Sequence, residues 1–271
     1  EPNLQQQLVE IGYQGKKLEE LEGLSATEKA KMLFIVQDPY TSYYDAKVVR
    51  DFVALTQKLG FSPILLPFKP NGKAMHIKGF LTRFSKTAKT QAEFLNRVAK
   101  LNVPLVGVDP AIVLSYRDEY KEALGDSRGD FHVLTAHEWL TNQLESNALQ
   151  SAVKNIAKSD RTFEWHLFPH CTESTFMPNS PKEWQHIFAQ FGQTLNVEKV
   201  GCCGMAGVFG HEVQNQTMSK DIYNVSWGKK LQGKDPNYCL ATGYSCRSQV
   251  KRYEKAILKH PVQALLEILN N

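Results

Sequence analysis

The sequence predicts an α/β protein with two parallel-sheet lobes, related by an internal duplication, and a helical N-terminal arm. Three observations lead to this prediction. Short apolar runs alternate with stretches of helical periodicity, a pattern typical of parallel strands joined by crossover helices. The alternation stops near residue 125 and then starts again, which indicates two lobes. The first 30 residues are polar and contain no apolar run that would predict a strand, which indicates an arm.

The predicted arm covers residues 1–30. It is rich in glutamine and in charged residues, as Gln5–Gln7 and Lys16–Glu20 show. This composition is helix-prone but offers little to a core. We therefore expect a connecting arm or lid rather than a core element.

The first lobe is predicted at residues 31–125. Buried strands are expected at residues 32–36, 63–67 and 104–108, and helices at about 48–59, 74–84 and 88–101. Each strand is followed by a turn signal, namely Asp38-Pro39, Pro70-Asn71-Gly72 or Asp109-Pro110. Strands that alternate with helices in this way form right-handed crossovers, so we expect a Rossmann-like lobe.

The second lobe is predicted at residues 126–271, after the turn-rich segment 125–130. A short strand and a helix are expected within residues 131–144. The first pattern then returns, with strands at residues 163–168, 195–200 and 238–242 and helices near 184–195 and 247–258. The second lobe is therefore expected to be Rossmann-like as well.

The two lobes match at an offset of 132 residues. This offset carries Asn71 to Cys203 (203 − 71) and Asp38 to His170, each beside a predicted strand end. It also carries Asp109 to Ala241. A fixed offset between similar patterns is the signature of an internal duplication.

Composition excludes several classes of function. The net charge is only +4 and the basic residues are scattered, so no nucleic-acid-binding stripe is expected. No apolar run approaches the roughly 20 residues of a membrane-spanning helix. The chain begins without Met or a signal-peptide pattern, so we expect a piece of a longer protein. Its 5 cysteines, an odd number, fit a reducing compartment in which thiols act as ligands.

Four cysteines lie at the ends of predicted strands. Cys171 follows the strand at 163–168, the pair Cys202-Cys203 follows the next strand, and Cys246 follows the last. The carboxyl ends of parallel strands meet at one edge of a sheet, so these thiols are expected to converge. The sequence therefore predicts a metal site, with Cys202 and Cys203 freed to point the same way by Gly204 and Gly207.

Other interpretations of these cysteines are open at this point. Buried, inert thiols are common in protein cores. Structural zinc sites usually contain Cys-x₂₋₄-Cys pairs, and adjacent cysteines form an awkward chelate for one ion. A cluster presents separate irons, which neighbouring sulfurs can bind. Cys239 lies inside a predicted strand and is interpreted as a core residue.

Residues near the cysteines are candidates for tuning the site. His170 and His211 are candidate hydrogen-bond donors rather than ligands, and Arg247 is a candidate for offsetting an anionic cluster. The spacing Gly201-x-x-Gly204-x-x-Gly207 is a weak dinucleotide-binding signal, because cysteines occupy the intervening positions. No Ser-His-Asp or paired-carboxylate arrangement favours hydrolysis.

The runs GCCGMAGVFGHE and ATGYSCRSQVKR, together with Cys171, resemble the cysteine-rich CCG domain. That domain occurs in the cysteine-rich subunit of heterodisulfide reductase and in iron–sulfur subunits of glycolate oxidase and anaerobic glycerol-3-phosphate dehydrogenase. The resemblance covers about residues 31–265. It is greatest to the C-terminal region of bacterial FAD-linked oxidoreductases of the YdiJ type, which are similar to D-lactate and D-2-hydroxyglutarate dehydrogenases.

The resemblance implies an iron–sulfur electron-transfer module. In such a parent protein, flavin oxidises a 2-hydroxy acid and electrons then leave through iron–sulfur centres to an acceptor that the sequence does not identify. FAD would belong to the parent and not to this chain. The implied partners are flavin and ferredoxin-like domains of the parent chain. The implied location is cytoplasmic or peripheral at the inner face of the membrane, and the isolated chain is expected to be inactive.

Two departures from the family pattern limit the number of clusters that the resemblance implies. The family motif ends in Cys-x-x-Cys, but Gly243 stands at the first of these positions and only Cys246 remains. The first lobe contains no cysteine. The resemblance therefore implies a single [4Fe-4S] cluster, held by Cys171, Cys202, Cys203 and Cys246. The alternative is a structural or docking module with a zinc or metal-free cysteine site.

Overall fold

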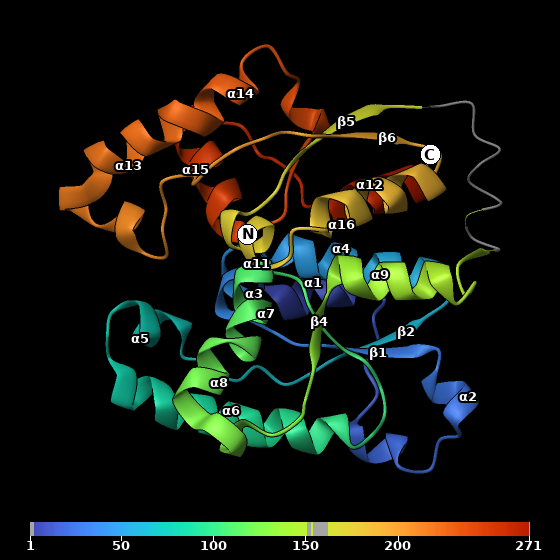
Figure 1. Ribbon diagram of the computed structural model, residues 1–271. Coiled ribbons are helices and arrows are strands. Elements are labelled where there is room, and N and C mark those ends of the chain that lie inside the picture. The colour runs from blue at the N-terminus through green and yellow to red at the C-terminus, as the bar shows by residue number, and fades with distance from the viewer. Residues whose placement is uncertain (1–2, 151–152, 154–161, 271) are drawn as a thin grey trace. The chain divides into compact units, whose positions relative to one another are not determined.

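The computed structural model describes residues 3–150, 153 and 162–270 (Figure 1). The chain divides into two compact units between Trp139 and Leu140. Each unit contains a parallel sheet covered by helices, so the predicted α/β class is confirmed. The sequence places the lobe boundary at residue 125, whereas the structure places residues 126–139 in the first unit. No helix in the described ranges is long and apolar enough to cross a membrane.

The first unit is built on a four-stranded sheet with the order β2-β1-β3-β4. Its strands are β1 (Met32–Ile35), β2 (Ser62–Leu65), β3 (Leu105–Gly107) and β4 (Val133–Thr135). Its helices and turns are α1 (Leu4–Glu10), η1 (Leu18–Leu21), α2 (Ala26–Lys29), α3 (Pro39–Tyr43), α4 (Ala46–Lys58), α5 (Lys73–Ile77), α6 (Leu81–Ala99), α7 (Pro110–Arg117), α8 (Glu119–Leu124) and η2 (Gly125–Arg128). Helix α9 (Ala136–Glu145) continues past the division.

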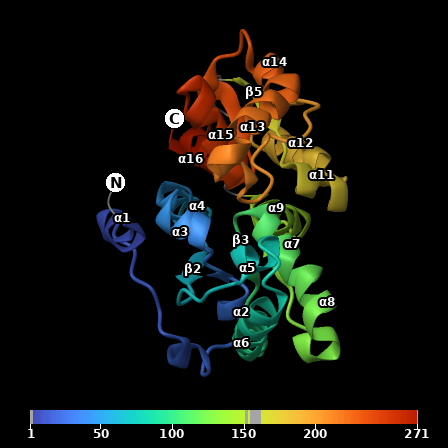
Figure 2. The same ribbon diagram turned by 90° about the vertical axis from the view of Figure 1, so that its left-hand side faces the viewer.

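Helices α4 and α6 lie on opposite faces of this sheet (Figures 1 and 2). Buried side chains recur every three or four residues along each helix, for example Phe84, Ala88 and Leu95 on α6. The strand residues Met32 and Phe34 belong to the same core cluster as this α6 stripe. Alternate strand residues can therefore serve opposite faces of the sheet.

The N-terminal arm contributes to the core of the first unit, contrary to the expectation of a purely peripheral element. Leu8 and Leu21 are buried, and Leu21 belongs to the core cluster. The Tyr13 hydroxyl accepts a hydrogen bond from the backbone N–H of Leu65 at 2.8 Å. Because Leu65 lies on the edge strand β2, this contact pairs a donor that would otherwise be open to another strand.

The second unit contains a three-stranded sheet with the order β6-β5-β7. Its strands are β5 (Glu164–Phe168), β6 (Thr194–Val197) and β7 (Cys239–Ala241). Its helices and turns are α11 (Cys171–Phe176), α12 (Ser180–Gln190), η3 (Phe209–His211), η4 (Val213–Asn215), α13 (Gln216–Tyr223), η5 (Asn224–Gly228), α14 (Lys229–Leu231), η6 (Pro236–Tyr238), α15 (Tyr244–Glu254) and α16 (Pro261–Asn270).

The strand registers of the two sheets match. Met32 pairs with Ser62 in the first sheet, and Glu164 pairs with Thr194 in the second, an offset of 132 on both strands (164 − 32 and 194 − 62). The third strand follows a different offset: Leu105 corresponds to Cys239, which is 134 (239 − 105). Asp109 therefore corresponds to Gly243 and not to Ala241, which a constant offset predicts.

Two helices lie between β2 and β3, as expected, but the boundary between them is not at about residue 85. Helix α5 ends near Ile77 and α6 begins at Leu81. Between them, Gly79 has a φ of +76°, which most side chains disfavour. The glycine therefore ends the first helix, and the second runs unbroken to Ala99.

Candidate metal centre

The four candidate cysteines lie on three turns at the carboxyl ends of the second sheet. Cys171 is the first residue of α11, directly after β5. Cys202 and Cys203 lie in the loop after β6. Cys246 lies in the first turn of α15, which follows β7. Since the three strands are parallel neighbours, their ends bring these turns to one edge of the sheet.

The four thiols lie close enough to influence one another's ionisation. Cys202 raises the pKa of Cys171, and Cys171 and Cys203 both lower the pKa of Cys202. The Cys203 thiol in turn interacts with Cys246. Cys203 and Cys246 are buried, whereas Cys171 and Cys202 are partly exposed. The structure thus brings together all four cysteines that the sequence identified as candidates.

The close packing of these sulfurs opposes their joint ionisation. Hydrogen bonding to Cys202 and burial raise the pKa of Cys171, and the same causes, with Cys246, raise the pKa of Cys203. The pKa of Cys202 is lowered, because Cys171 and Cys203 both donate to it. One thiolate is therefore favoured over several. Bound metal would supply the positive charge that full ionisation of the set requires.

The loop that carries Cys202 and Cys203 is fixed by glycine geometry and by buried amides. Gly204 has a φ of +83°, and its N–H donates to the Cys202 sulfur at 3.3 Å. The Gln249 side chain donates to the carbonyl of Cys203 at 2.9 Å. Ser219 donates to the carbonyl of Gly204 at 2.7 Å. These contacts hold the cysteine pair against helices α13 and α15.

His170 connects the turn of Cys171 with the turn of Cys246. It caps α11, where its Nδ1 accepts a hydrogen bond from the backbone N–H of Thr172 at 3.2 Å. Its Nε2 lies 3.2 Å from the hydroxyl of Ser245. Its side chain is buried. His170 therefore contacts residues next to two of the candidate ligands.

A buried carboxylate holds the same two turns together. Glu173 accepts hydrogen bonds from the hydroxyls of Ser180 and Thr242. The Thr242 hydroxyl also accepts the backbone N–H of His170 at 3.0 Å. Sequence reasoning missed Glu173 and Thr242. The only available signal was their position next to the cysteine-bearing turns.

Arg247, a candidate for offsetting an anionic cluster, is buried at the end of β7. Its guanidinium donates to the carbonyls of Ala241 and Thr242 at 2.9 and 3.0 Å. These bonds fix the strand end from which α15 starts. The residue therefore places a buried positive charge one residue after Cys246 in the sequence.

The remaining candidates have different surroundings. His211 is exposed in η3, and its pKa is lowered by partial burial and by Arg252. Cys239 is buried at the start of β7, and its pKa is raised to about 11 by burial, opposed by Lys234. None of the four candidate ligand cysteines is among the groups that shift the pKa of Cys239.

The donor set consists of four thiols, which can be compared with the needs of a single ion and of a cluster. One zinc ion needs its ligands about 2.0–2.3 Å from one point. Among the residues that the structure describes, no three His, Cys, Asp or Glu side chains are placed to hold one metal ion. Four thiols match one four-iron cluster in the number and the type of its ligands.

The matching positions in the first unit carry no thiols. By the register offsets, Pro39, Pro70, Asn71 and Ile112 stand where the second unit has its four cysteines. Asp38 and Asp109 cap α3 and α7 at the corresponding strand ends. Proline and isoleucine offer no ligand atom, and an amide is a poor partner for iron–sulfur iron.

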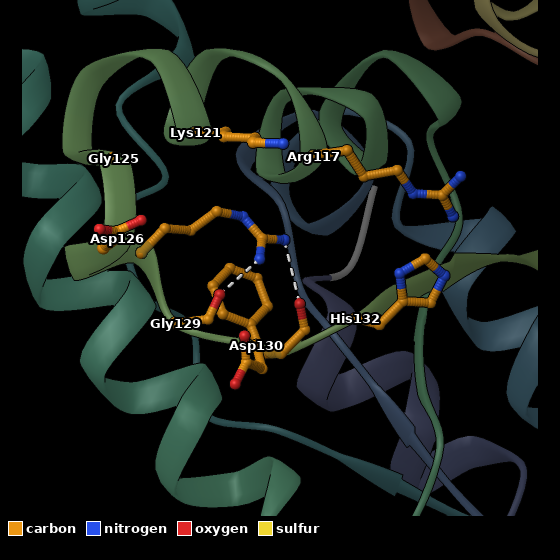
Figure 3. A pocket seen from close by; sticks show the side chains of 9 residues that line it. Arg117, Lys121, Gly125, Asp126, Gly129, Asp130 and His132 are labelled. Carbon is orange, nitrogen blue, oxygen red and sulfur yellow. Dashed lines mark hydrogen bonds between the residues drawn. The ribbon is translucent and has the colours of Figure 1, made fainter.

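A hollow of about 540 Å³ in the first unit is lined by charged side chains rather than by cysteines (Figure 3). Its arginines are engaged within the fold. Arg128 donates to the carbonyls of Gly129 and Phe131 at 2.8 and 3.0 Å, and Arg117 pairs with Glu138. The Arg128 bonds close the turn between α8 and β4, and the Arg117–Glu138 pair links α7 with α9. Both roles are structural.

Comparisons with known proteins point to dehydrogenases. No family model matches the chain. The D-2-hydroxyglutarate dehydrogenase of Haemophilus influenzae is 81% identical over 269 residues, which cover 99% of this chain and 26% of that protein. The protein of the same name in Escherichia coli is 57% identical over 268 residues, again 99% and 26%. The chain thus spans about a quarter of the length of these relatives.

A more distant relative is a separate subunit of another dehydrogenase. This subunit of the anaerobic glycerol-3-phosphate dehydrogenase of Escherichia coli is 21% identical over 234 residues. The match covers 85% of this chain and 57% of that polypeptide. The region is therefore similar both to part of a long dehydrogenase and to a separate dehydrogenase subunit.

Proposed function

We propose that the second unit binds one [4Fe-4S] cluster through Cys171, Cys202, Cys203 and Cys246 and serves in electron transfer. The observation that supports this proposal is the gathering of four thiols from three strand-end turns, close enough to shift one another's pKa values. Four thiolates are the number that such a cluster requires. When bound, the cluster supplies one-electron transfer.

The surrounding residues would hold and shield this group. Cys203 and Cys246 belong to a buried apolar cluster that also contains Phe168, Tyr223 and Trp227. This cluster would exclude water from one side of the site. The N–H of Gly204 would stabilise the Cys202 thiolate, and buried Arg247 would favour negative charge near Cys246.

We further propose that the chain is the iron–sulfur part of an FAD-linked 2-hydroxy acid dehydrogenase. The names of the two close relatives support D-2-hydroxyglutarate as the substrate of the parent protein. FAD would bind elsewhere in that parent. The partners of this chain would be the flavin and ferredoxin-like domains of the parent, and the location would be the reducing cytoplasm, where free thiols persist.

Iron and acid-labile sulfide analysis of the anaerobically purified chain tests the cluster. The expected result is about four irons and four sulfides per chain, the composition of one [4Fe-4S] cluster. Cys246→Ser is expected to lose most of the iron. Cys239→Ser is the matched control, because it removes a buried cysteine that is not one of the four candidate ligands, and it should keep the iron.

Two results would contradict the proposal. One is zinc without sulfide, which would favour the alternative of a structural or docking module. The other is equal iron loss in Cys246→Ser and Cys239→Ser, which would show that the loss follows general destabilisation rather than removal of a ligand.

A further inference from the structure

The space beside Gly243 is filled by the ring of His170. A Cβ built on Gly243 would lie 2.2 Å from Cδ2 of His170 and 2.9 Å from its Cγ. Such distances are far below van der Waals contact, so no side chain fits at position 243 while the ring is in place. Gly243 therefore leaves room for an imidazole between the turns of Cys171 and Cys246.

Hydrogen bonds define which ring nitrogen of His170 carries the proton. Nδ1 accepts from the N–H of Thr172, so the neutral ring carries its proton on Nε2. Nε2 lies 3.2 Å from the hydroxyl of Ser245. The histidine therefore donates and Ser245 accepts.

Ser245 has its own proton to donate onward. Because its oxygen accepts from His170, its O–H can point elsewhere, and the sulfur of Cys246 lies 3.9 Å from that oxygen. A thiolate bound to iron is a better acceptor than a neutral thiol. The series thus runs from the Thr172 N–H through His170 and Ser245 to Cys246.

We propose that His170 is a positioning residue that acts through Ser245, by directing the serine hydroxyl at the ligand sulfur of Cys246. This inference rests on the proposed function, since it assigns a role in tuning the bound cluster. Hydrogen bonds to ligand sulfurs stabilise the reduced, more negative form of a cluster and so raise its reduction potential. The relay would therefore make the cluster easier to reduce.

The first test removes the donor. Ser245→Ala should keep the iron content of the wild-type chain and lower the reduction potential, measured by a redox titration followed by electron paramagnetic resonance. Ser245→Thr keeps a hydroxyl and should restore the potential. Ser248→Ala is the control, because Ser248 lies on the same helix and its hydroxyl bonds to no residue that the structure describes. Its potential should match the wild type.

The second test separates the two nitrogens of His170. In His170→Asn, the amide can still accept from Thr172 but is too short to reach Ser245, so the potential should fall as in Ser245→Ala. In His170→Gln, the longer amide can donate to Ser245, so the reduction potential should fall less than in His170→Asn. The double variant His170→Asn with Ser245→Ala should show no further fall, because both changes interrupt one relay.

Each outcome decides a different point. An unchanged potential in Ser245→Ala with full iron content would overturn the relay and leave the proposed function intact. Iron loss in Ser245→Ala would overturn the assigned role, because the residue would then hold the site rather than tune it. A wild-type chain without iron and sulfide would overturn the proposed function and this inference with it.

Discussion

The ring of His170 occupies the space that a side chain at position 243 would need. Its Cδ2 atom lies 2.2 Å from where a Cβ of Gly243 would be. A cysteine at position 243, which the resemblance to the CCG domain implies for other proteins, could not be introduced here by one substitution. The ring of His170 would have to move first, and it is held by Thr172 and Ser245. The two residues are therefore expected to be energetically coupled.

Gly243→Ala should lower the free energy of unfolding by about 1–3 kcal/mol, the usual cost of overpacking a buried site. Urea denaturation followed by circular dichroism measures it. In the background of His170→Ala, the same substitution should cost much less, because the clashing ring is absent. The coupling between the two changes should be about 0.5–3 kcal/mol.

Gly23→Ala is the control for glycine replacement itself, since a Cβ there would meet nothing within 4 Å. It should change the free energy of unfolding by less than about 0.5 kcal/mol. If Gly243→Ala costs the same with and without the His170 ring, the clash is relieved in another way and the coupling is absent.

The buried carboxylates of the first unit should make its stability depend on pH. Burial, and then the charge of Asp109, raise the pKa of Asp38 from 3.8 to about 6. A carboxyl with a raised folded-state pKa contributes stability that is fully present below its unfolded pKa. That stability is lost as the pH rises through the folded pKa. Between pH 4 and pH 7.5 the loss should be roughly 2–3 kcal/mol.

The variant Asp109→Asn tests this cause. Asparagine can still cap α7, so the helix start is kept, but the charge beside Asp38 is removed. The pKa of Asp38 should fall and the pH profile of urea denaturation should flatten. Asp126→Asn, at an exposed position of the same unit, should leave the profile unchanged. Equal profiles for wild type and Asp109→Asn would contradict the assignment.

Much of the fold was predictable because its signals are local. Apolar runs and glycine or proline turns mark most strand ends, and the offset of 132 residues reappears in the pairing of β1 with β2 and of β5 with β6. The change to 134 at β7 was not predictable, because two helices precede β3 whereas a longer series of short helices and turns precedes β7. Only hydrogen-bond register reveals that Asp109 corresponds to Gly243.

The candidate cysteines were also predictable from their places at strand ends, but their support was not. Glu173 bonds to Thr242, which follows it by 69 residues, and Gln249 bonds to the carbonyl of Cys203, which precedes it by 46. Contacts of this kind depend on how helices lie against the sheet. No periodicity or motif in one sequence encodes them.

Iron binding should depend on the second unit alone. Cys203→Ser should remove most of the iron, because oxygen is a poor ligand for an iron–sulfur cluster. Asn71→Ala, at the matching position of the first unit, should leave iron nearly unchanged. Iron analysis beside circular dichroism compares them. Equal loss in both variants would show that the first unit is needed for iron binding.

The glycine after the cysteine pair should be needed for metal binding as well as for stability. In Gly204→Ala, the residue has a φ of +83° and its Cβ would lie 2.1 Å from the backbone oxygen of Ser219, which cannot rotate away. The loop must shift, so both stability and iron content should fall.

The matched variant is Gly72→Ala, with a φ of +79° and a Cβ 2.9 Å from the ring of Phe84. A ring can move, so this variant should cost about 1–2 kcal/mol and retain its iron. Iron per chain, measured after folding is verified by circular dichroism, separates the two. Full iron content in a folded Gly204→Ala variant would show that the cysteine pair tolerates a different loop conformation.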